Sequence, residues 1–129
     1  MKKVLIDTSV WIEYFRGASA ADPVSDLIDS NLLCINELIL AEMVPFLKIQ
    51  KQETVIELLS EVENIPLNIH WNELIGFQEK NLSSGINNVG IPDLIIIQNV
   101  LQNGLQLFSF DKHFGLMQKL FKFKLFSPE

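Results

Sequence analysis

The sequence predicts an α/β fold built on a central, mainly parallel sheet of four to five strands with helices on both faces. Short apolar runs of strand length alternate along the chain with longer, helix-like segments, and this alternation is typical of parallel sheets. The chain has 129 residues and is 48% hydrophobic, which suits one domain, residues 1–129, with one buried core. No repeat, low-complexity segment or linker interrupts it.

The N-terminal half is predicted to hold three strands and four helices. In chain order they are a strand over 3–6, helices over 10–15 and 22–30, a strand over 32–35, helices over 37–48 and 52–62, and a strand over 65–67. The first strand is an apolar run that stops at Asp7, where Asp7-Thr8-Ser9 forms a turn ahead of a helix. Pro23 suits a first helical turn, and Asn36 suits a helix N-cap.

The C-terminal half continues the same alternation. We expect helices over 70–84 and 94–102, a strand over 106–108, a helix over 112–119 and a last strand over 122–126. The second of these helices follows a turn formed by residues 90–93 and ends at Asn103-Gly104, because glycine is the usual residue just past a helix.

The composition indicates a cytoplasmic protein. No run approaches the roughly 18 apolar residues of a membrane span, and Asp7 interrupts the apolar start too early for a secretory signal. Cys34 is the sole cysteine, and its apolar neighbours predict a small buried side chain in a reducing compartment. The net charge of −6, taken alone, argues against a nucleic-acid partner, because proteins that bind nucleic acids usually carry a basic surface.

Four acidic residues stand at positions where a site would form. Asp7 and Asp111 follow predicted strands, and in open α/β sheets sites form beyond the carboxyl ends of the strands. Asp93 begins an apolar helix, and Glu42 lies within another. Taken singly, each is as readily a turn residue or a helix cap. Glu42 is the exception, because an unpaired carboxylate is costly if its helix is buried on most sides.

These acidic residues point to a metal if the fold brings them together. Carboxylates that converge on one cleft repel each other unless a cation neutralises them. Oxygen ligands without histidine or cysteine suit Mg²⁺ or Mn²⁺ rather than zinc.

Four segments resemble the motifs of PIN-domain nucleases, in particular the VapC-type toxins of type II toxin–antitoxin systems. In order they are VLIDTSVWIEYFRG at 4–17, ILAEM at 39–43, IPDLII at 91–96 and LFSFDKHF at 107–114. The motifs occur in the family's order, and the resemblance extends over essentially the whole chain. The resemblance implies a three-layer α/β/α fold and a Mg²⁺- or Mn²⁺-dependent endoribonuclease. Asp7 and Asp93 would be direct ligands, and Glu42 and Asp111 would complete the acidic set by ligation or by holding water.

Residues beside these acids follow the family pattern in part. Thr8 and Ser9 stand at the first turn, where they would orient the first carboxylate or a water. Ser109 stands where the family often has threonine and would do similar work. Ile39 occupies a place where a small hydroxyl residue is common, and Pro45 one where glycine is frequent. Both departures put the pose of the second motif's glutamate in question.

The resemblance implies three partners: an RNA substrate, a cognate antitoxin protein and a second copy of the chain in a homodimer. Contacts to RNA phosphates would come from basic residues near the fourth motif and from one in the first helix, namely Lys112, Lys119, Lys122, Lys124 and Arg16. For any one of these lysines, a solvated surface position is an equally good interpretation.

The first predicted helix carries three aromatic residues, Trp11, Tyr14 and Phe15. Trp11 and Phe15 are four residues apart and share a helical face, for which core packing is the default interpretation. The alternative is a groove in which the antitoxin lays an apolar segment along this helix and projects an arginine or lysine into the acidic cleft.

Two other functions have features in common with this sequence. A phosphoaspartate protein has a similar sheet. One kind, the response-regulator receiver, needs paired acids after the first strand, and this sequence has only Asp7 there. A haloacid-dehalogenase-type phosphatase needs Asp-x-Asp, and position 9 is serine. The remaining alternative is a catalytically silent PIN-like binding module that acts through its partner surface.

Overall fold

The computed structural model of this chain describes residues 2–128. Its strands are β1 (Val4–Ile6), β2 (Leu33–Ile35), β3 (Glu63–Asn64), β4 (Gln106–Phe108) and β5 (Lys124–Leu125). Its helices are α1 (Thr8–Phe15), the 3-10 turn η1 (Ser19–Ala21), α2 (Pro23–Asp29), α3 (Glu37–Ile49), α4 (Glu53–Glu61), α5 (Trp71–Ser83), α6 (Ile91–Asn103) and α7 (Lys112–Phe121). None of the described helices is long and apolar enough to cross a membrane.

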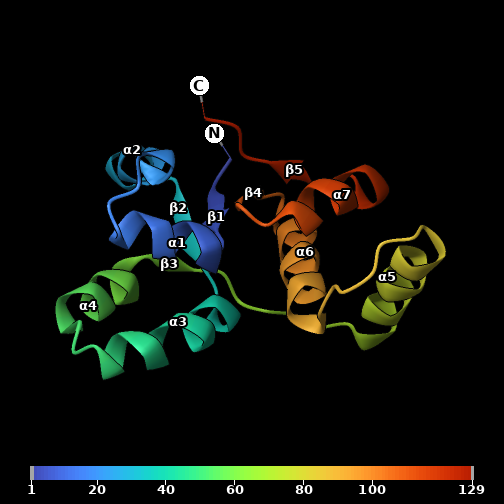
Figure 1. Cartoon of the computed structure of the whole chain (residues 1–129), viewed down its shortest axis with the longest axis horizontal. Helices are drawn as coiled ribbons and strands as arrows, with labels where there is room; N and C mark the ends of the chain where they lie inside the picture. Colours follow the sequence, from blue (N-terminus) through green and yellow to red (C-terminus); the bar gives the residue numbers. More distant parts are fainter. Residues whose placement is uncertain (1, 129) are drawn as a thin grey trace.

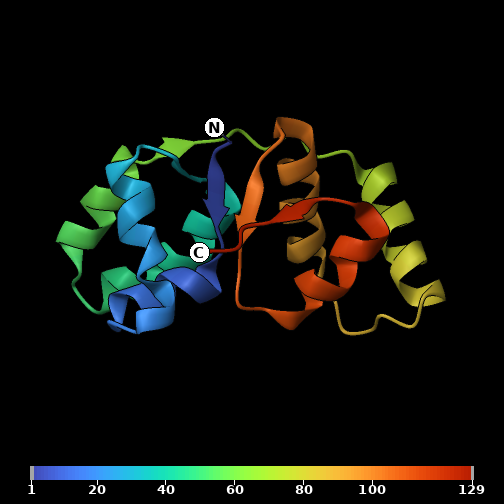
Figure 2. The same ribbon diagram turned by 90° about the horizontal axis from the view of Figure 1, so that it is seen from above.

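The strands form one parallel sheet in the order β3-β2-β1-β4-β5. At its centre, Leu5 of β1 lies between Cys34 of β2 and Leu107 of β4. The helices flank the strands in two groups, with α1–α4 on one side of β1 and α5–α7 on the other (Figures 1 and 2). Right-handed crossovers that leave the central strands in opposite directions produce this arrangement. The predicted three-layer α/β/α fold is confirmed, with five strands.

Helix α6 is the most deeply buried helix segment next to the sheet. Every residue from Leu94 to Val100 is buried, so the helix must be apolar on nearly all sides. Gln98 and Asn99 are its polar exceptions, and both are hydrogen-bonded. The Gln98 Oε1 accepts from the His70 N–H at 3.1 Å, and the Asn99 Nδ2 donates to the Pro66 carbonyl at 3.0 Å. These bonds fasten α6 to the segment between β3 and α5.

The third strand lies earlier than the sequence pattern predicted. The prediction placed it over the apolar residues 65–67, whereas β3 ends at Asn64. Ile65 still donates its N–H to the Ile35 carbonyl at 2.7 Å, but Pro66 has no N–H with which to continue the ladder. The edge strand is therefore polar and exposed, and a search for apolar runs misses it.

Two helices begin earlier than predicted. Helix α1 starts at Thr8 instead of residue 10, and α6 starts at Ile91 instead of residue 94. Pro92 fits the first turn of α6, where no N–H partner is needed. As a result, Asp93 lies inside the first helical turn, and the residue at the N-cap is Gly90.

Candidate functional site

The candidate site lies where the two central strands end. The chain leaves β1 toward β2 and leaves β4 toward β5, so the carboxyl ends of these neighbouring strands form a topological switch point, where sites form in open α/β sheets. Asp7 is the first residue after β1, and its N–H donates to the Phe108 carbonyl at the end of β4, at 2.9 Å. This bond joins the strand ends at the point from which Asp7, Ser109 and Asp111 leave the sheet.

Asp7 occupies the N-cap position of α1, yet its side chain makes no capping hydrogen bond. Its Oδ2 accepts instead from the hydroxyls of Ser9 and Ser109, both at 2.8 Å. The residue is only 7% exposed, and the two hydroxyls satisfy one oxygen of its buried carboxyl group. The interpretation of Asp7 as a simple helix cap is therefore wrong.

The same two hydroxyls also hold the loop between β4 and α7. Ser9 accepts from the Phe110 N–H and Ser109 from the Asp111 N–H, each at 3.0 Å. The two oxygens lie 3.4 Å apart. Because each hydroxyl both donates and accepts, the residues after β1 and those after β4 form one hydrogen-bonded unit.

Asp111 does act as a helix cap. Its Oδ1 accepts from the His113 N–H at 2.9 Å and begins α7. The His113 ring also faces it, with Nδ1 3.1 Å from the same oxygen. Among the described residues, no side chain donates to the second oxygen of Asp111. The capping role therefore uses one of the two carboxylate oxygens.

Asp93 has the most perturbed carboxyl group of the four. Partial burial in the first turn of α6 raises its pKa, and the charges of Asp111, Asp7 and Glu42 raise it further, to about 6. The neighbouring His113 opposes this shift. Since three other acids act on one carboxyl, all four lie within electrostatic reach at this end of the sheet.

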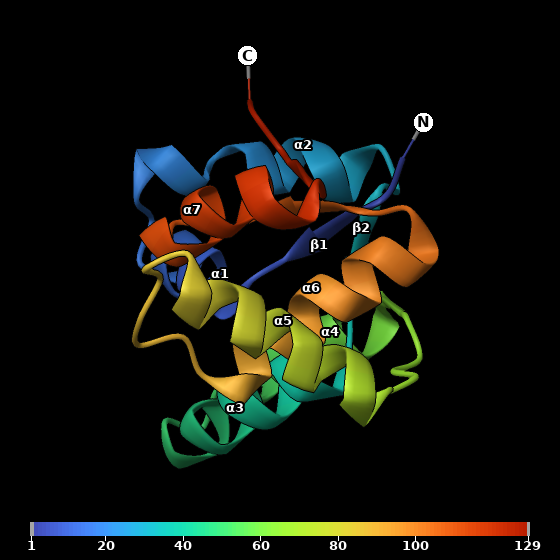
Figure 3. The same ribbon diagram turned by 90° about the vertical axis from the view of Figure 1, so that its right-hand side faces the viewer.

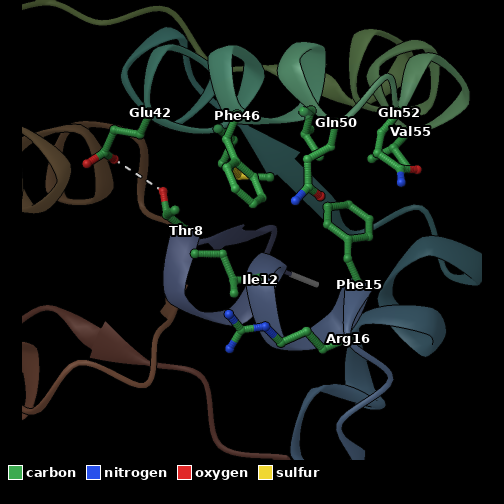
Figure 4. A pocket seen from close by; sticks show the side chains of 11 residues that line it. Thr8, Ile12, Phe15, Arg16, Glu42, Phe46, Gln50, Gln52 and Val55 are labelled. Carbon is green, nitrogen blue, oxygen red and sulfur yellow. Dashed lines mark hydrogen bonds between the residues drawn. The ribbon is translucent and has the colours of Figure 1, made fainter.

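Glu42 departs most from expectation, because it lies on the exposed side of α3. The core face of that helix is formed by Ile39, Met43 and Leu47, so the argument from a fully buried glutamate is wrong. The Thr8 hydroxyl donates to Glu42 Oε1 at 3.2 Å (Figure 4). Loss of water around the carboxyl group raises its pKa; the Thr8 bond opposes this, and the charge of Asp7 adds to it.

The donor set fits a hard divalent cation. The four side chains offer only carboxylate oxygens, and within residues 2–128 none of them forms an ion pair with a lysine or arginine. In the same range, no three His, Cys, Asp or Glu side chains lie close enough together to hold one ion. Mg²⁺ is commonly held in proteins by one or two carboxylates, with water in the remaining positions.

A buried amide pair links the two helices that carry acidic residues. Asn36 caps α3 by accepting from the Ile39 N–H at 2.9 Å, and its Nδ2 donates to Asn99 Oδ1 of α6 at 3.0 Å. The helix bearing Glu42 is thereby tied to the helix bearing Asp93. The sequence predicts Asn36 only as a cap and assigns no role to Asn99. An amide inside an apolar, seven-residue buried run is the signal that would have found it, because it must have a partner there.

A groove of about 630 Å³ runs between α1 and the α3–α4 pair, with Glu42 and Thr8 at one end (Figure 4). Its apolar wall includes Ile12 and Phe15 of α1 and Phe46 of α3. Ile12 is 40% exposed and Phe46 is 57% exposed, which is unusual for side chains of this size. The groove therefore offers apolar surface that leads directly to one of the four carboxylates.

The prediction that three aromatic residues of α1 line a partner groove is wrong for Trp11 and Tyr14, which do not line it. Trp11 is fully buried and stacks on Phe15 with ring centroids 5.6 Å apart. Tyr14 turns toward α2, where its hydroxyl lies 3.2 Å from a serine hydroxyl. Phe15 lines the groove as expected, together with Ile12 and Phe46, which the sequence analysis did not single out.

The basic residues named above lie on two separate surfaces. All four lysines are exposed, on α7, at its C-terminal end and on β5. Arg16 lines the groove on the other side of the molecule and pairs with Glu13 at 3.1 Å. The sheet separates Arg16 from the lysines, as Figure 1 shows for α1 and α7.

Comparisons with known proteins place this geometry in context. Residues 4–120 match a family model described as the PIN domain. A chain of the DNA-bound VapBC from Salmonella typhimurium is similar with a TM-score of 0.69 and 18% identity, over 89% of this chain and 92% of that one. A chain of VapBC2 from Rickettsia felis, in a structure with a DNA fragment from the promoter, is similar with a TM-score of 0.71 and 15% identity, over 98% of both chains. No curated protein matches the sequence.

Proposed function

Because this chain belongs to the PIN domain family, we propose that it is a Mg²⁺- or Mn²⁺-dependent endoribonuclease that serves as the toxin of a type II toxin–antitoxin pair. PIN domains are typically nucleases, and the single observation that supports the activity here is the charge coupling of four carboxylates. The pKa of Asp93 rises to about 6 because three other acids act on it without a compensating lysine or arginine. A bound cation relieves that repulsion.

In this proposal Asp7 and Asp93 ligate the ion, and Glu42 and Asp111 ligate it or hold its waters. When bound, the ion would lower the pKa of a water and offset the charge that develops on the scissile phosphate. Asp7 is suited to ligation because Ser9 and Ser109 both donate to its Oδ2, and no described side chain donates to Oδ1.

The hydroxyls contribute orientation. Ser9 and Ser109 fix the plane of the Asp7 carboxylate and hold the loop that leads to Asp111. Thr8 directs one oxygen of Glu42 toward the β1–α1 turn. Fixed carboxylates cost less to organise when an ion and a phosphate bind, which is how a preorganised site lowers a barrier.

RNA would approach from the lysine-bearing side. From Asp111 to the end of the described chain, four exposed lysines lie on α7, at its end and on β5, and Asp111 is the only acidic residue in this segment. Lysines in such numbers supply phosphate contacts without reading sequence. The overall charge of −6 then reflects, in part, the carboxylates of the site itself.

The activity is tested with purified protein, Mn²⁺ or Mg²⁺ and a structured RNA. Asp7→Asn and Asp93→Asn should each lower the cleavage rate about a thousandfold, the loss expected when a metal ligand is removed. The matched control is Asp29→Asn, an exposed acid of α2, which should cleave at the wild-type rate. Wild-type protein that folds, binds its partner protein and leaves RNA intact with both ions would instead identify a silent binding module.

The groove between α1 and the α3–α4 pair is our proposed antitoxin site. The two similar structures are VapBC complexes, and the groove combines apolar walls with an acidic end at Glu42. An amphipathic segment would bury Phe15 and Phe46, and an arginine or lysine from it would pair with the carboxylates and compete with the ion.

A short reading frame for a DNA-binding protein, identified next to the gene for this chain, would supply the protein to test. Co-expressed with this chain, its product should bind Phe46→Ala and Phe15→Ala at least tenfold more weakly than wild type. Ile49→Ala is the matched control, because Ile49 is 81% exposed on the same helix but does not line the groove. Full-strength binding by both folded groove variants would place the antitoxin elsewhere.

A further inference from the structure

The loop between β4 and α7 presents an exposed aromatic ring beside the candidate site. Phe110 is 40% exposed, and it stands between Ser109, which donates to Asp7, and Asp111, which begins α7. An exposed phenylalanine is common by itself, since folded proteins leave much apolar surface in contact with water. This one is distinguished by its place between two residues of the site and by the way it is held.

Hydrogen bonds fix the backbone of Phe110 on both sides. Its N–H donates to Ser9 Oγ at 3.0 Å, and the next N–H, that of Asp111, donates to Ser109 Oγ at 3.0 Å. Both hydroxyls also donate to Asp7 Oδ2, each at 2.8 Å. In Figure 3, α7 accordingly begins beside α1. The backbone that carries the ring therefore has a fixed position relative to the Asp7 carboxylate.

The ring of Phe110 is also supported from below. It packs on Phe108 with ring centroids 5.4 Å apart and planes at 82°, an edge-to-face arrangement. Phe108 is buried and packs in turn on Phe126, so the supporting ring is itself held by the core. In an edge-to-face pair, at least one face of each ring is not covered by the other. Phe110 therefore offers ring surface to solvent while its backbone and its inner side are held in place.

This surface suits a nucleobase. Proteins commonly bind single strands through aromatic side chains on which bases stack, because every base has a flat π face. Bases are uncharged, so the net charge of −6, which repels phosphates, does not weaken such a contact. Lys112 is exposed in the first turn of α7, two residues further on, where it would contact a phosphate of the same strand. Residues 110–112 thus combine an aromatic ring, a carboxylate of the site and a lysine.

We propose that Phe110 is a substrate-binding residue whose ring stacks on an unpaired base next to the scissile phosphate. The stacked base holds the strand at the end of the sheet where the four carboxylates lie. This inference rests on the proposed function, because it takes RNA as the substrate, and it adds a contact that does not depend on charge.

Binding of a short, fluorescein-labelled single-stranded RNA of mixed sequence tests the contact, measured by fluorescence anisotropy in EDTA so that no metal-dependent cleavage occurs. Phe110→Ala and Phe110→Leu should each raise the Kd about tenfold, because both remove the aromatic face on which the base stacks. Phe110→Trp should bind at least as tightly as wild type. Added salt should weaken binding by all of these proteins but leave the ratio between Phe110→Ala and wild type unchanged, because stacking releases no counterions.

The matched control for binding is Leu101→Ala, which shortens an apolar side chain of α6 that is 41% exposed and should bind the RNA like wild type. Wild-type affinity in both folded variants, Phe110→Ala and Phe110→Leu, would overturn the proposal. So would a wild type that does not bind the RNA. Variants that keep RNA binding and lose only antitoxin binding would assign the ring to that protein and would also overturn it.

Cleavage kinetics with Mn²⁺ separate this inference from the proposed function. Phe110→Ala should raise KM about tenfold with kcat little changed, as expected for a contact made equally in the ground state and the transition state. A lower kcat at unchanged KM and Kd would mean that the ring only supports Asp111, and would overturn the inference. If wild type binds RNA through Phe110 but cleaves none with either ion, the nuclease is refuted and the base contact stands. If Phe110→Ala cleaves with wild-type kcat and KM, the nuclease stands and the base contact is refuted.

Discussion

The four carboxylates of the candidate site fall into two halves that are held differently: Asp7 and Asp111 follow strands and form the strand half, and Glu42 and Asp93 lie on helices and form the helix half. In the strand half, Asp7 accepts from two serine hydroxyls and Asp111 accepts from a backbone N–H and faces His113. In the helix half, Glu42 has one hydroxyl donor, at 3.2 Å, and Asp93 has none among the described side chains. Burial and like charge raise the pKa of both carboxyls in the helix half.

This difference shows where a cation would act. Burial and like charge make ionisation of Glu42 and Asp93 costly, and a bound cation would relieve that cost. In the strand half, hydrogen bonds already orient the carboxyl groups of Asp7 and Asp111. In the helix half, a bound ion would stabilise the charged form of Glu42 and Asp93. The predictions that follow change one half at a time.

The largest effect is expected from removing the donors of the strand half. Ser9→Ala with Ser109→Ala should lower the free energy of unfolding by about 3 kcal/mol, because the buried Asp7 carboxylate loses two charge-assisted hydrogen bonds. Urea unfolding at neutral pH measures this loss. Ser30→Ala, an exposed serine after α2, is the control and should change the free energy little. A double variant as stable as wild type would show that the hydroxyls do not support Asp7.

A slightly smaller effect is expected from the ion. Mn²⁺ at a hundredfold excess over its dissociation constant should stabilise the folded protein by about 2.7 kcal/mol and raise the melting temperature by several degrees. Asp93→Asn should remove most of the increase, because the helix half then lacks its strongest ligand. Equal melting curves for wild type with and without millimolar Mn²⁺ would count against a metal site.

Without an ion, neutralising the helix half should stabilise the protein. The folded pKa of Asp93 is about 6 against an ordinary 3.8, so the folded state binds this proton more tightly than the unfolded chain. Stability therefore falls as pH rises from about 4 to about 6 and stays low above that range. At pH 8, metal-free Asp93→Asn should be more stable than wild type by on the order of 2 kcal/mol, and its unfolding free energy should lack this pH dependence. A destabilised Asn variant at pH 8 would refute the repulsion.

The smallest effect is expected at Thr8. Thr8→Val removes the hydroxyl that donates to Glu42, so the pKa of Glu42 should rise further and stability at neutral pH should fall by about 1 kcal/mol. Thr54→Val, an exposed threonine of α4, is the matched control. Carboxyl carbon NMR follows the titration of Glu42 in both variants. An unchanged pKa of Glu42 in Thr8→Val would mean that the hydrogen bond does not stabilise the ionised carboxylate.

Sequence reasoning was most successful where local pattern decides the structure. The strand that stops at Asp7, the Asn36 cap and the glycine that ends α6 are set by neighbouring residues, and each lies where it was predicted. The parallel sheet followed from the alternation of strands and helices, and the buried Cys34 from its apolar run.

The errors concern properties that packing decides. Which face of α3 is buried depends on the sheet beneath it, so the exposure of Glu42 could not be read from its apolar neighbours. The burial of Trp11 and the exposure of Phe46 likewise depend on how α1 lies against α3. The Asn36–Asn99 hydrogen bond joins residues 63 positions apart, and a local sequence pattern cannot predict such a bond.

The most direct test of a site divided in this way is the pKa of Asp93, measured by carboxyl carbon NMR with and without Mg²⁺. The account predicts a pKa of about 6 in the metal-free protein, because burial and the charges of Asp111, Asp7 and Glu42 disfavour ionisation. With saturating Mg²⁺ the apparent pKa should fall by one unit or more, since the ion binds the ionised form. A metal-free pKa near the ordinary 3.8, unmoved by Mg²⁺, would contradict it.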